Sequence, residues 1–172
     1  MNFRNATGGD LSAMKEIVRQ AQASLKARGV DQWQNGYPSD EVILRDIARQ
    51  QAYVATADGR VIAMATVVFD DEPTYDRITD GRWLSTGAFA VVHRMAVDDR
   101  FRQCGVASFI FGQVEAMCRH NGTRSFKVDT HRDNLPMRRF LEKHGFTRCG
   151  IIFLHDGNER IAYEKLLDDD NR

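Results

Sequence analysis

The chain has 172 residues, with 24 lysines and arginines balanced by 24 aspartates and glutamates, so its formal net charge is zero. This length suits a single domain with a substantial core, which we place at residues 1–167, and the balanced charge disfavours binding to nucleic acid. No apolar run reaches the ~18–20 residues that cross a bilayer, and the polar start lacks the features of a secretion signal. We therefore expect a cytoplasmic protein without a membrane partner.

Three cysteines, Cys104, Cys118 and Cys149, lie far apart in the sequence. They lack the close spacing that zinc sites and redox dithiols require, so we expect free thiols and no metal site. The acidic end, residues 168–172, is predicted to form a frayed tail because its like charges repel one another.

The N-terminal part is predicted to form a strand and two helices. The strand covers Asn2 to Ala6, and Asp10 then precedes apolar residues that recur at helical spacing, so we expect Asp10 to cap an amphipathic helix. A loop from Arg28 to Asp40 follows. Ser39, at the end of that loop, is predicted to cap the second helix.

The middle of the chain is predicted to form a hairpin and a central strand. Two apolar runs, Ala52–Ala55 and Val61–Phe69, are separated by Asp58-Gly59, a dipeptide that favours a tight antiparallel turn. After a polar loop, the run Phe89–Val97 is mostly apolar without clean alternation. This pattern is typical of a strand covered on both faces, so we place the central strand there.

The last part is predicted to contain two helices, a strand and a hairpin. Apolar residues from Val106 to Cys118 recur at helical spacing and predict a helix. Residues Ser125–Thr130 are predicted to form a strand that runs parallel to the central strand. Asn134 is predicted to cap a helix, and a final hairpin turns at Asp156-Gly157. The sequence thus predicts an α/β (α+β) fold with a mixed sheet of six to seven strands and helices on both faces.

The junction RFRQCGVAS, Arg100–Ser108, lies between the central strand and the next helix. Amide N–H groups at a helix start lack intrahelical partners, and Gly105 would let backbone approach a ligand closely, so the junction can bind an anion. Arg100 and Arg102 would add positive charge. An ordinary strand-to-helix loop is an equally good interpretation of these residues alone. The dinucleotide pattern GxGxxG and the phosphate-loop pattern GxxxxGK[ST] are both absent.

Two motifs resemble the GNAT superfamily of N-acetyltransferases. Arg102, Gly105 and Ala107 match its Arg-x-x-Gly-x-Ala pyrophosphate loop, and NLPMRRFLEKHGF, Asn134–Phe146, is similar to its Asn-initiated helix ending in Gly-Phe. The element order resembles the family from Asn2 to about Leu167. The resemblance implies a three-layer fold whose two central parallel strands splay apart.

The resemblance also implies an activity and a donor. The protein would move an acetyl group from acetyl-CoA, without a metal, to an amine of a small molecule or a protein by direct attack in a ternary complex. The central strand would align the pantetheine arm, with a backbone N–H near Met95 facing the oxyanion, and the loop amides would hold the pyrophosphate. The implied cofactor-binding residues are Met95, Ala96, Val97, Arg102, Gln103, Cys104, Gly105, Val106, Ala107, Ser108 and Asn134.

The general base and acid are assigned from chemistry and position. His93 precedes the cofactor strand residues and titrates near neutral pH, which makes it a candidate general base; a structural histidine is the alternative. Many family members carry a tyrosine seven residues after the asparagine, where this chain has Leu141. Water or Tyr163 would have to protonate the departing thiolate instead.

The acceptor side is the least defined part of the sequence. The resemblance places Trp33 and Tyr37 in an acceptor lid, although packing against the sheet is the alternative for both, as it is for Tyr75 and Trp83. Asp129 is a candidate substrate-site residue that would orient a histidine or balance Arg94.

Two other classes of protein remain open from the sequence. The missing tyrosine fits a non-catalytic module that binds or senses acyl-CoA, and a third interpretation is an interaction domain without a cofactor. A homodimer is compatible with the resemblance.

Overall fold

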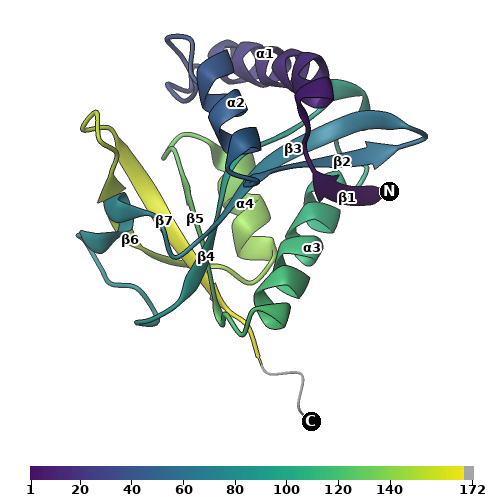
Figure 1. Ribbon diagram of the computed structural model, residues 1–172. Helices are drawn as coiled ribbons and strands as arrows, with labels where there is room; N and C mark the ends of the chain where they lie inside the picture. The colour runs from purple at the N-terminus through teal and green to yellow at the C-terminus, as the bar shows by residue number, and fades with distance from the viewer. Residues whose placement is uncertain (169–172) are drawn as a thin grey trace. The chain divides into compact units, whose positions relative to one another are not determined.

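The computed structural model describes residues 1–168, so residues 169–172 of the predicted tail lie outside the described residues (Figure 1). The chain divides into two compact units. The first unit contains Met1–Val67 and Val92–Gln113, and the second contains Val68–Val91 and the described residues from Val114 onward. In the described part of the chain, seven strands form one mixed sheet in the order β1-β2-β3-β4-β5-β7-β6, which confirms the predicted α/β fold.

Three antiparallel strands lie at one end of this order. They are β1 (Asn2–Asn5), β2 (Ala52–Ala57) and β3 (Arg60–Phe69). Asp58 and Gly59 connect β2 and β3 with φ angles of 48° and 74°, as a tight hairpin turn with two left-handed residues requires. The predicted strand and hairpin are confirmed.

Two helices of the first unit, α1 (Leu11–Ala27) and α2 (Asp40–Ala48), lie side by side in Figure 1. The Ser39 hydroxyl caps α2 by accepting a bond from the Val42 N–H at 3.4 Å, as predicted. The predicted cap at Asp10 is wrong in its chemistry. Asp10 precedes α1, but its carboxylate makes no capping bond to the helix and instead accepts from the Thr7 N–H and the Arg4 guanidinium.

The apolar faces of α1 and α2 pack together in the core of the first unit. Met14, Ile17 and Ile43 are each 1 % exposed there. They pack with Val54, Met64 and Ala96 from the strands. This core holds α1 and α2 against the strand residues of the same unit.

Three elements contain the boundaries between the units, and the first is β3, which leaves the first unit after Val67. Strand β4 (Phe89–Val97) enters the first unit at Val92, and helix α3 (Val106–His120) leaves it after Gln113. A short 3₁₀ turn, Asp99–Phe101, lies between them. The observed bounds of β4 equal the predicted ones.

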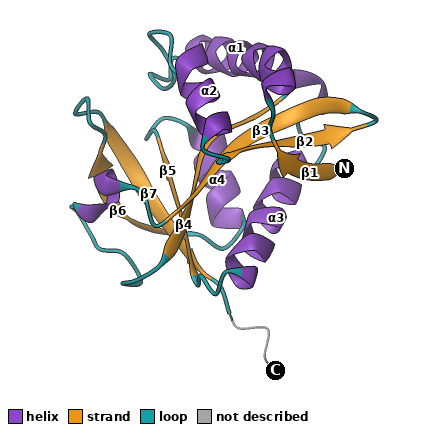
Figure 2. Cartoon of the chain, viewed as in Figure 1, coloured by secondary structure: helices purple, strands orange, loops and turns teal. Residues whose placement is uncertain are grey.

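The second unit contains the remaining strands, visible in orange in Figure 2. Strand β5 (Ser125–Thr130) pairs in parallel with the first three residues of β4, and β7 (Glu159–Leu166) pairs antiparallel with both β5 and β6 (Thr147–Phe153). A parallel pairing that covers only the start of β4 fits strands that splay apart.

Helix α4 (Leu135–Lys143) precedes β6. Asn134 occupies the position before α4, but its side chain makes no capping bond to the helix, in contrast to the prediction. Gly145 follows the helix with a φ of 83°, a left-handed conformation that favours glycine and ends the helix.

The loop before β4 packs into the second unit through its aromatic residues. Tyr75, in a short 3₁₀ turn (Pro73–Asp76), is 2 % exposed and lies 5.1 Å from Trp83 between ring centroids. The Trp83 indole N–H donates to the Tyr75 carbonyl at 2.9 Å. Packing is therefore the observed role of both residues.

Candidate functional site

The loop between β4 and α3 turns through two left-handed residues. Gln103 has a φ of 61° and Gly105 a φ of 76°. The first bond of the helix runs from the Phe109 N–H to the Gly105 carbonyl at 2.9 Å, so the amides of Val106 and Ala107 have no acceptor inside the helix. The start of α3 thus offers backbone donors of the kind that bind anions.

The space beside this loop is open. Residues 102–105 are exposed, and a Cβ atom built on Gly105 would meet nothing within 4 Å. A side chain at this position would start in open space rather than point into the protein. The loop therefore fits a phosphate group that approaches the backbone closely.

Both arginines of the loop are paired with aspartates, so they add less positive charge for an anion than predicted. The Arg102 guanidinium lies 2.5 Å from the Asp99 carboxylate and also donates to the Ser24 hydroxyl at 3.1 Å. The Arg100 guanidinium lies 2.9 Å from the Asp98 carboxylate. Hydrogen bonds from Arg100 lower the pKa of Asp98. Because both charges are balanced, the attraction of this loop for an anion comes mainly from its backbone.

The strand segment before the loop contains the predicted pantetheine contacts. Met95 and Val97 are half-buried, and Ala96 is buried in the core of the first unit. The end of the segment is fixed because the Asp98 N–H donates to the Ile62 carbonyl at 2.9 Å. The backbone of this segment is therefore held in place from the β3 side.

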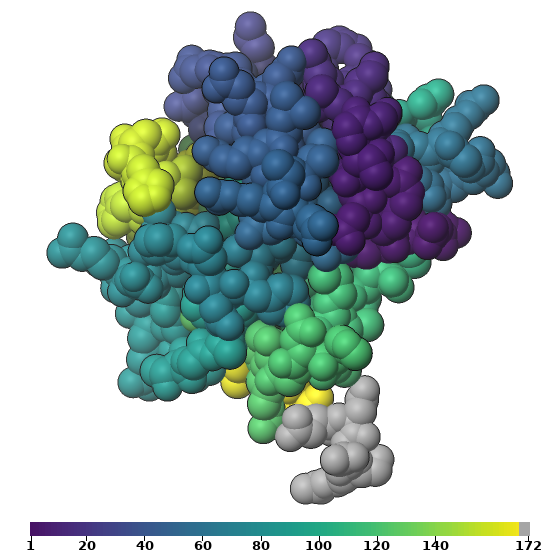
Figure 3. Space-filling view, in the orientation of Figure 1, coloured from purple at the N-terminus to yellow at the C-terminus, as the bar shows by residue number. Residues whose placement is uncertain are grey.

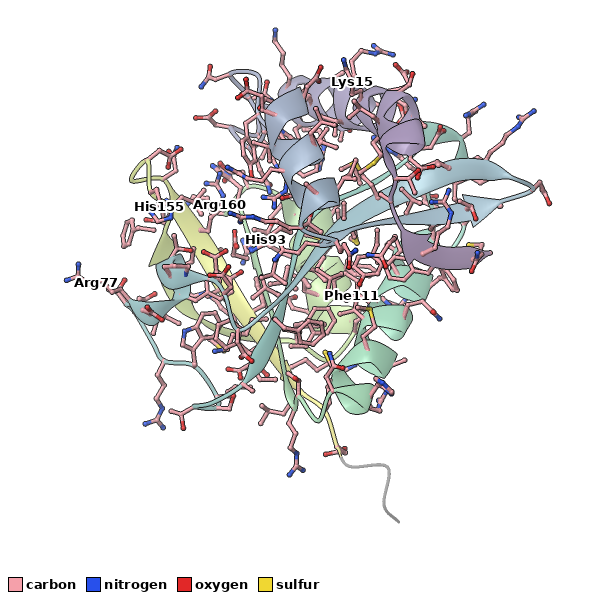
Figure 4. The ribbon with its side chains drawn as sticks, in the orientation of Figure 1. Lys15, Arg77, His93, Phe111, His155 and Arg160 are labelled. Carbon is pink, nitrogen blue, oxygen red and sulfur yellow. The ribbon has the colours of Figure 1, made fainter. Side chains whose placement is uncertain are left out.

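His93, the candidate base, is half-buried, and its Nε2 atom is enclosed. Figure 4 shows it in the interior of the drawn side chains, whereas Lys15 on α1 lies at the outside. The next residue, Arg94, has a φ of 47°. A left-handed residue breaks strand alternation, so the two-residue spacing of His93 and Met95 does not place their side chains on one face of β4.

A buried polar cluster surrounds the Arg94 side chain. Its Nε donates to the Asp46 carboxylate at 2.6 Å, and the Thr66 hydroxyl donates to the same oxygen at 2.9 Å. Its Nη1 donates to the Tyr37 hydroxyl at 2.8 Å. The carboxylate that balances Arg94 is thus Asp46, not Asp129 as the sequence interpretation suggested. Asp46 follows Ile43 by three residues, and a charge on the apolar face of a helix was the available signal.

The two aromatic residues of the predicted acceptor loop lie in different environments. Trp33 is half-buried and packs against the core of the first unit, which is the packing role left open above. Tyr37 is 41 % exposed, and its hydroxyl bonds to Arg94. Of the two, Tyr37 is the more exposed.

Four residues that the sequence analysis considered for binding or catalysis belong to the second unit. The Asp129 carboxylate accepts from the Tyr75 hydroxyl at 2.7 Å, and burial raises the Tyr75 pKa well above its ordinary value. Tyr163 is fully buried; its hydroxyl accepts from Arg138 at 3.3 Å and donates to Glu142 at 3.4 Å. The remaining two are Leu141, which is also fully buried, and Asn134.

Residues 1–168 contain no group of three histidine, cysteine or acidic side chains that could hold a metal ion. Within the same range, the helices are too short or too polar to cross a bilayer.

Comparison with known proteins identifies the family. Residues 14–146 match the model of the acetyltransferase (GNAT) family. A GNAT-family acetyltransferase from Streptococcus agalactiae is 30 % identical with a TM-score of 0.88, over 98 % of this chain and 96 % of that one. No curated protein matches the sequence.

More distant structures share the fold. A GNAT-family acetyltransferase from Listeria monocytogenes is 17 % identical with a TM-score of 0.69, over 96 % of this chain and 94 % of that one. The ribosomal-protein-S18-alanine N-acetyltransferase of Escherichia coli is 15 % identical with a TM-score of 0.64, over 99 % and 97 %. The family match and the 30 % identical relative establish that the chain belongs to the GNAT family of acetyltransferases.

Proposed function

We propose that this protein transfers an acetyl group from acetyl-CoA to an amine of a small molecule or a protein, by direct attack in a ternary complex. One observation carries the proposal: the exposed loop at the start of α3 turns through left-handed Gln103 and Gly105, inside the part of the chain that matches the family. That geometry presents backbone N–H groups to an anion such as the coenzyme A pyrophosphate.

The donor would be held mainly by backbone. The amides from Gln103 to Ser108 would bind the pyrophosphate, with Arg102 exchanging its contact with Asp99 for one with phosphate. The Met95–Val97 backbone would align the pantetheine arm, and the Asn134 side chain would add a contact. Acetyl-CoA supplies the acetyl group as a thioester that a neutral amine can attack.

The amine must lose its proton before attack. An acceptor with a lysine-like pKa of about 10.4 is disfavoured by about 4.6 kcal/mol in its neutral form at pH 7. His93, half-buried just before the predicted pantetheine segment, is the proposed base, directly or through water. The Met95 N–H would donate to the oxyanion that forms.

The departing thiolate requires less help. A thiol pKa of about 8.5 lies ~1.5 units above neutral pH, so an acid contributes only about 2 kcal/mol. Leu141 cannot supply this proton, and Tyr163 or water takes that role in the proposal. The absence of a tyrosine at Leu141 therefore slows the reaction without preventing it.

A pair of matched glycine variants tests the donor loop. Gly105→Glu should weaken coenzyme A binding by about 10- to 100-fold, because its carboxylate would repel the pyrophosphate and cover the loop amides. Gly59→Glu, in the β2–β3 turn, is the control because Gly59 also has a left-handed φ and nothing within 4 Å of an added Cβ. Calorimetry measures both affinities, and equal affinities would refute the loop assignment.

Thiol release with acetyl-CoA and a panel of amines tests catalysis. Amine-dependent release at a rate that saturates with both substrates supports the proposed reaction. Tight coenzyme A binding without amine-dependent release would instead favour a non-catalytic module, the alternative that the buried Leu141 suggests. Calorimetry without coenzyme A binding would contradict both.

A further inference from the structure

Arg94 occupies an unusual backbone position in β4. Its φ of 47° is left-handed, a conformation that costs a long side chain about 1–2 kcal/mol unless surrounding contacts hold it. It lies directly before the Met95–Val97 segment that the proposed function assigns to the donor. Whatever holds Arg94 in this conformation therefore also sets the course of that segment.

The guanidinium is fixed first by a buried ion pair. The side chains of Arg94 and Asp46 are 14 % and 5 % exposed, and their closest atoms lie 2.6 Å apart. Thr66 donates to the same Asp46 oxygen. These contacts fasten Arg94 to α2 and β3, and the Asp46 charge balances its own, so the cluster is a poor site for an anionic ligand.

The other end of the guanidinium reaches the loop before α2, residues 28–39. Its Nη1 donates to the Tyr37 hydroxyl at 2.8 Å. The Tyr37 carbonyl accepts from the Gln22 side chain at 2.7 Å, and Gln34 donates to the Gln22 carbonyl at 3.2 Å, so the loop backbone is tied to α1. In Figure 3 the surface of α2 lies beside that of the N-terminal elements, which form one continuous face of the first unit.

The Tyr37 side chain is partly exposed and is bonded to Arg94 through its hydroxyl. It is 41 % exposed, whereas Trp33 in the same loop packs into the core. The bond from the charged and largely enclosed Arg94 guanidinium therefore restrains the ring. Removing the hydroxyl should free the ring while leaving the buried ion pair intact.

We propose that Arg94 is a positioning residue that couples the loop 28–39 to the bend in β4. Through Tyr37 it fixes the loop that faces the acceptor, and through Asp46 it fixes the backbone before Met95. The inference rests on the proposed function for its effect on the reaction, but its structural part stands on the contacts alone. It assigns Arg94 no contact with either substrate.

Kinetics with Tyr37→Phe test the coupling. With an amine from the panel that supports thiol release as the acceptor, the variant should raise the acceptor KM about tenfold while kcat and the affinity for coenzyme A stay within about twofold. Arg94→Lys keeps a charge beside Asp46 but loses the forked geometry, so it should raise the acceptor KM similarly and also lower kcat. In the double variant, Tyr37→Phe should add less than about twofold to Arg94→Lys.

Tyr53→Phe is the matched control. Tyr53 lies on β2 of the same unit and stacks on Phe3 with 5.0 Å between ring centroids. Removing its hydroxyl should leave the acceptor KM unchanged. The inference is wrong if Tyr37→Phe also leaves the acceptor KM unchanged. It is also wrong if the rise in acceptor KM in the double variant equals the product of the rises in the two single variants.

Hydrogen exchange separates this inference from the proposed function. Amides of residues 28–39 should exchange several-fold faster in Tyr37→Phe than in the wild type, with unchanged exchange in α3. This readout needs no turnover, so a wild-type protein without amine-dependent thiol release would contradict the proposed function alone. Unchanged exchange in residues 28–39 would overturn the coupling even if Arg94→Lys fails to fold.

Discussion

In the first unit, three buried carboxylates are each paired with an arginine, whereas in the second unit buried Glu164 accepts hydrogen bonds from neutral donors and buried Lys127, opposite it on the paired strand, lies against aromatic rings. The pairs are Asp10 with Arg4, Asp46 with Arg94 and Asp98 with Arg100. In the second unit, Glu164 accepts from the Leu84 N–H and the Ser125 hydroxyl, both at 2.6 Å, and from the Ser85 hydroxyl. The Lys127 ammonium lies 4.2 Å and 4.3 Å from the ring centroids of Phe89 and Trp83.

This difference determines what each charge can do for function. An arginine pair joins two elements through a forked, directional contact, which suits the coupling proposed for Arg94. A carboxylate bonded by loop amides and hydroxyls fixes one loop in place, and the rings around Lys127 enclose its side chain. The arginine pairs therefore couple the positions of two segments, whereas the neutral contacts of the second unit fix the position of a single segment.

The largest expected effect tests the pair of Arg94 and Asp46, whose side chains are 14 % and 5 % exposed. Asp46→Asn should lower the free energy of unfolding by about 3 kcal/mol, because the Arg94 charge stays buried without its partner. Asp40→Asn, on the same helix, is the control, since Asp40 and Lys15 are about half exposed and such pairs contribute less than about 1 kcal/mol. Urea unfolding measures both, and similar losses would show that burial of the pair is unimportant.

The neutral network of the second unit should be the next most sensitive. Glu164→Gln should cost about 2 kcal/mol, because an amide offers one acceptor oxygen and turns its NH2 group toward donors. Glu159→Gln on the same strand is the control, since Glu159 makes a surface pair with Arg132. Equal unfolding midpoints in urea for the two variants would contradict the role of Glu164.

The fold was predictable where short-range chemistry decides it. The bounds of β4 follow from an apolar run, and the turns at Asp58-Gly59 and Asp156-Gly157 follow from residues that tolerate left-handed backbone. Asp10 was misassigned because its carboxylate finds the Arg4 guanidinium, a tertiary contact that helix-capping rules do not include.

The candidate site was predictable only in part. The loop around Gly105 could be found because a family motif and backbone physics agree there. The Arg94 cluster could not, because Asp46 lies 48 residues earlier and meets Arg94 only after α2 packs on the strands. The left-handed backbone of Arg94 likewise depends on contacts that no local pattern encodes.

The smallest expected effect concerns the lysine of the second unit. Burial lowers the pKa of Lys127, while Glu164 on the facing strand favours its charged form. The folded protein therefore binds this proton less tightly than the unfolded chain, so the contribution of Lys127 to stability rises as pH rises toward about 10.4. Lys127→Met lacks this proton and should be more stable than the wild type by up to about 1 kcal/mol at pH 7, after the lost contacts with the rings are counted.

The stability difference between Lys127→Met and the wild type should therefore shrink as pH rises, since the penalty disappears once the lysine is neutral in both states. Urea unfolding at several pH values between 7 and 10.4 measures that difference, with the exposed Lys143→Met as a control for the loss of a positive charge. A difference that grows with pH would mean that the folded protein binds the Lys127 proton more tightly than the unfolded chain does. In that case the rings and Glu164 together would raise the Lys127 pKa by more than burial lowers it. The second unit would then stabilise its buried cation, as the arginine pairs stabilise the buried carboxylates of the first unit.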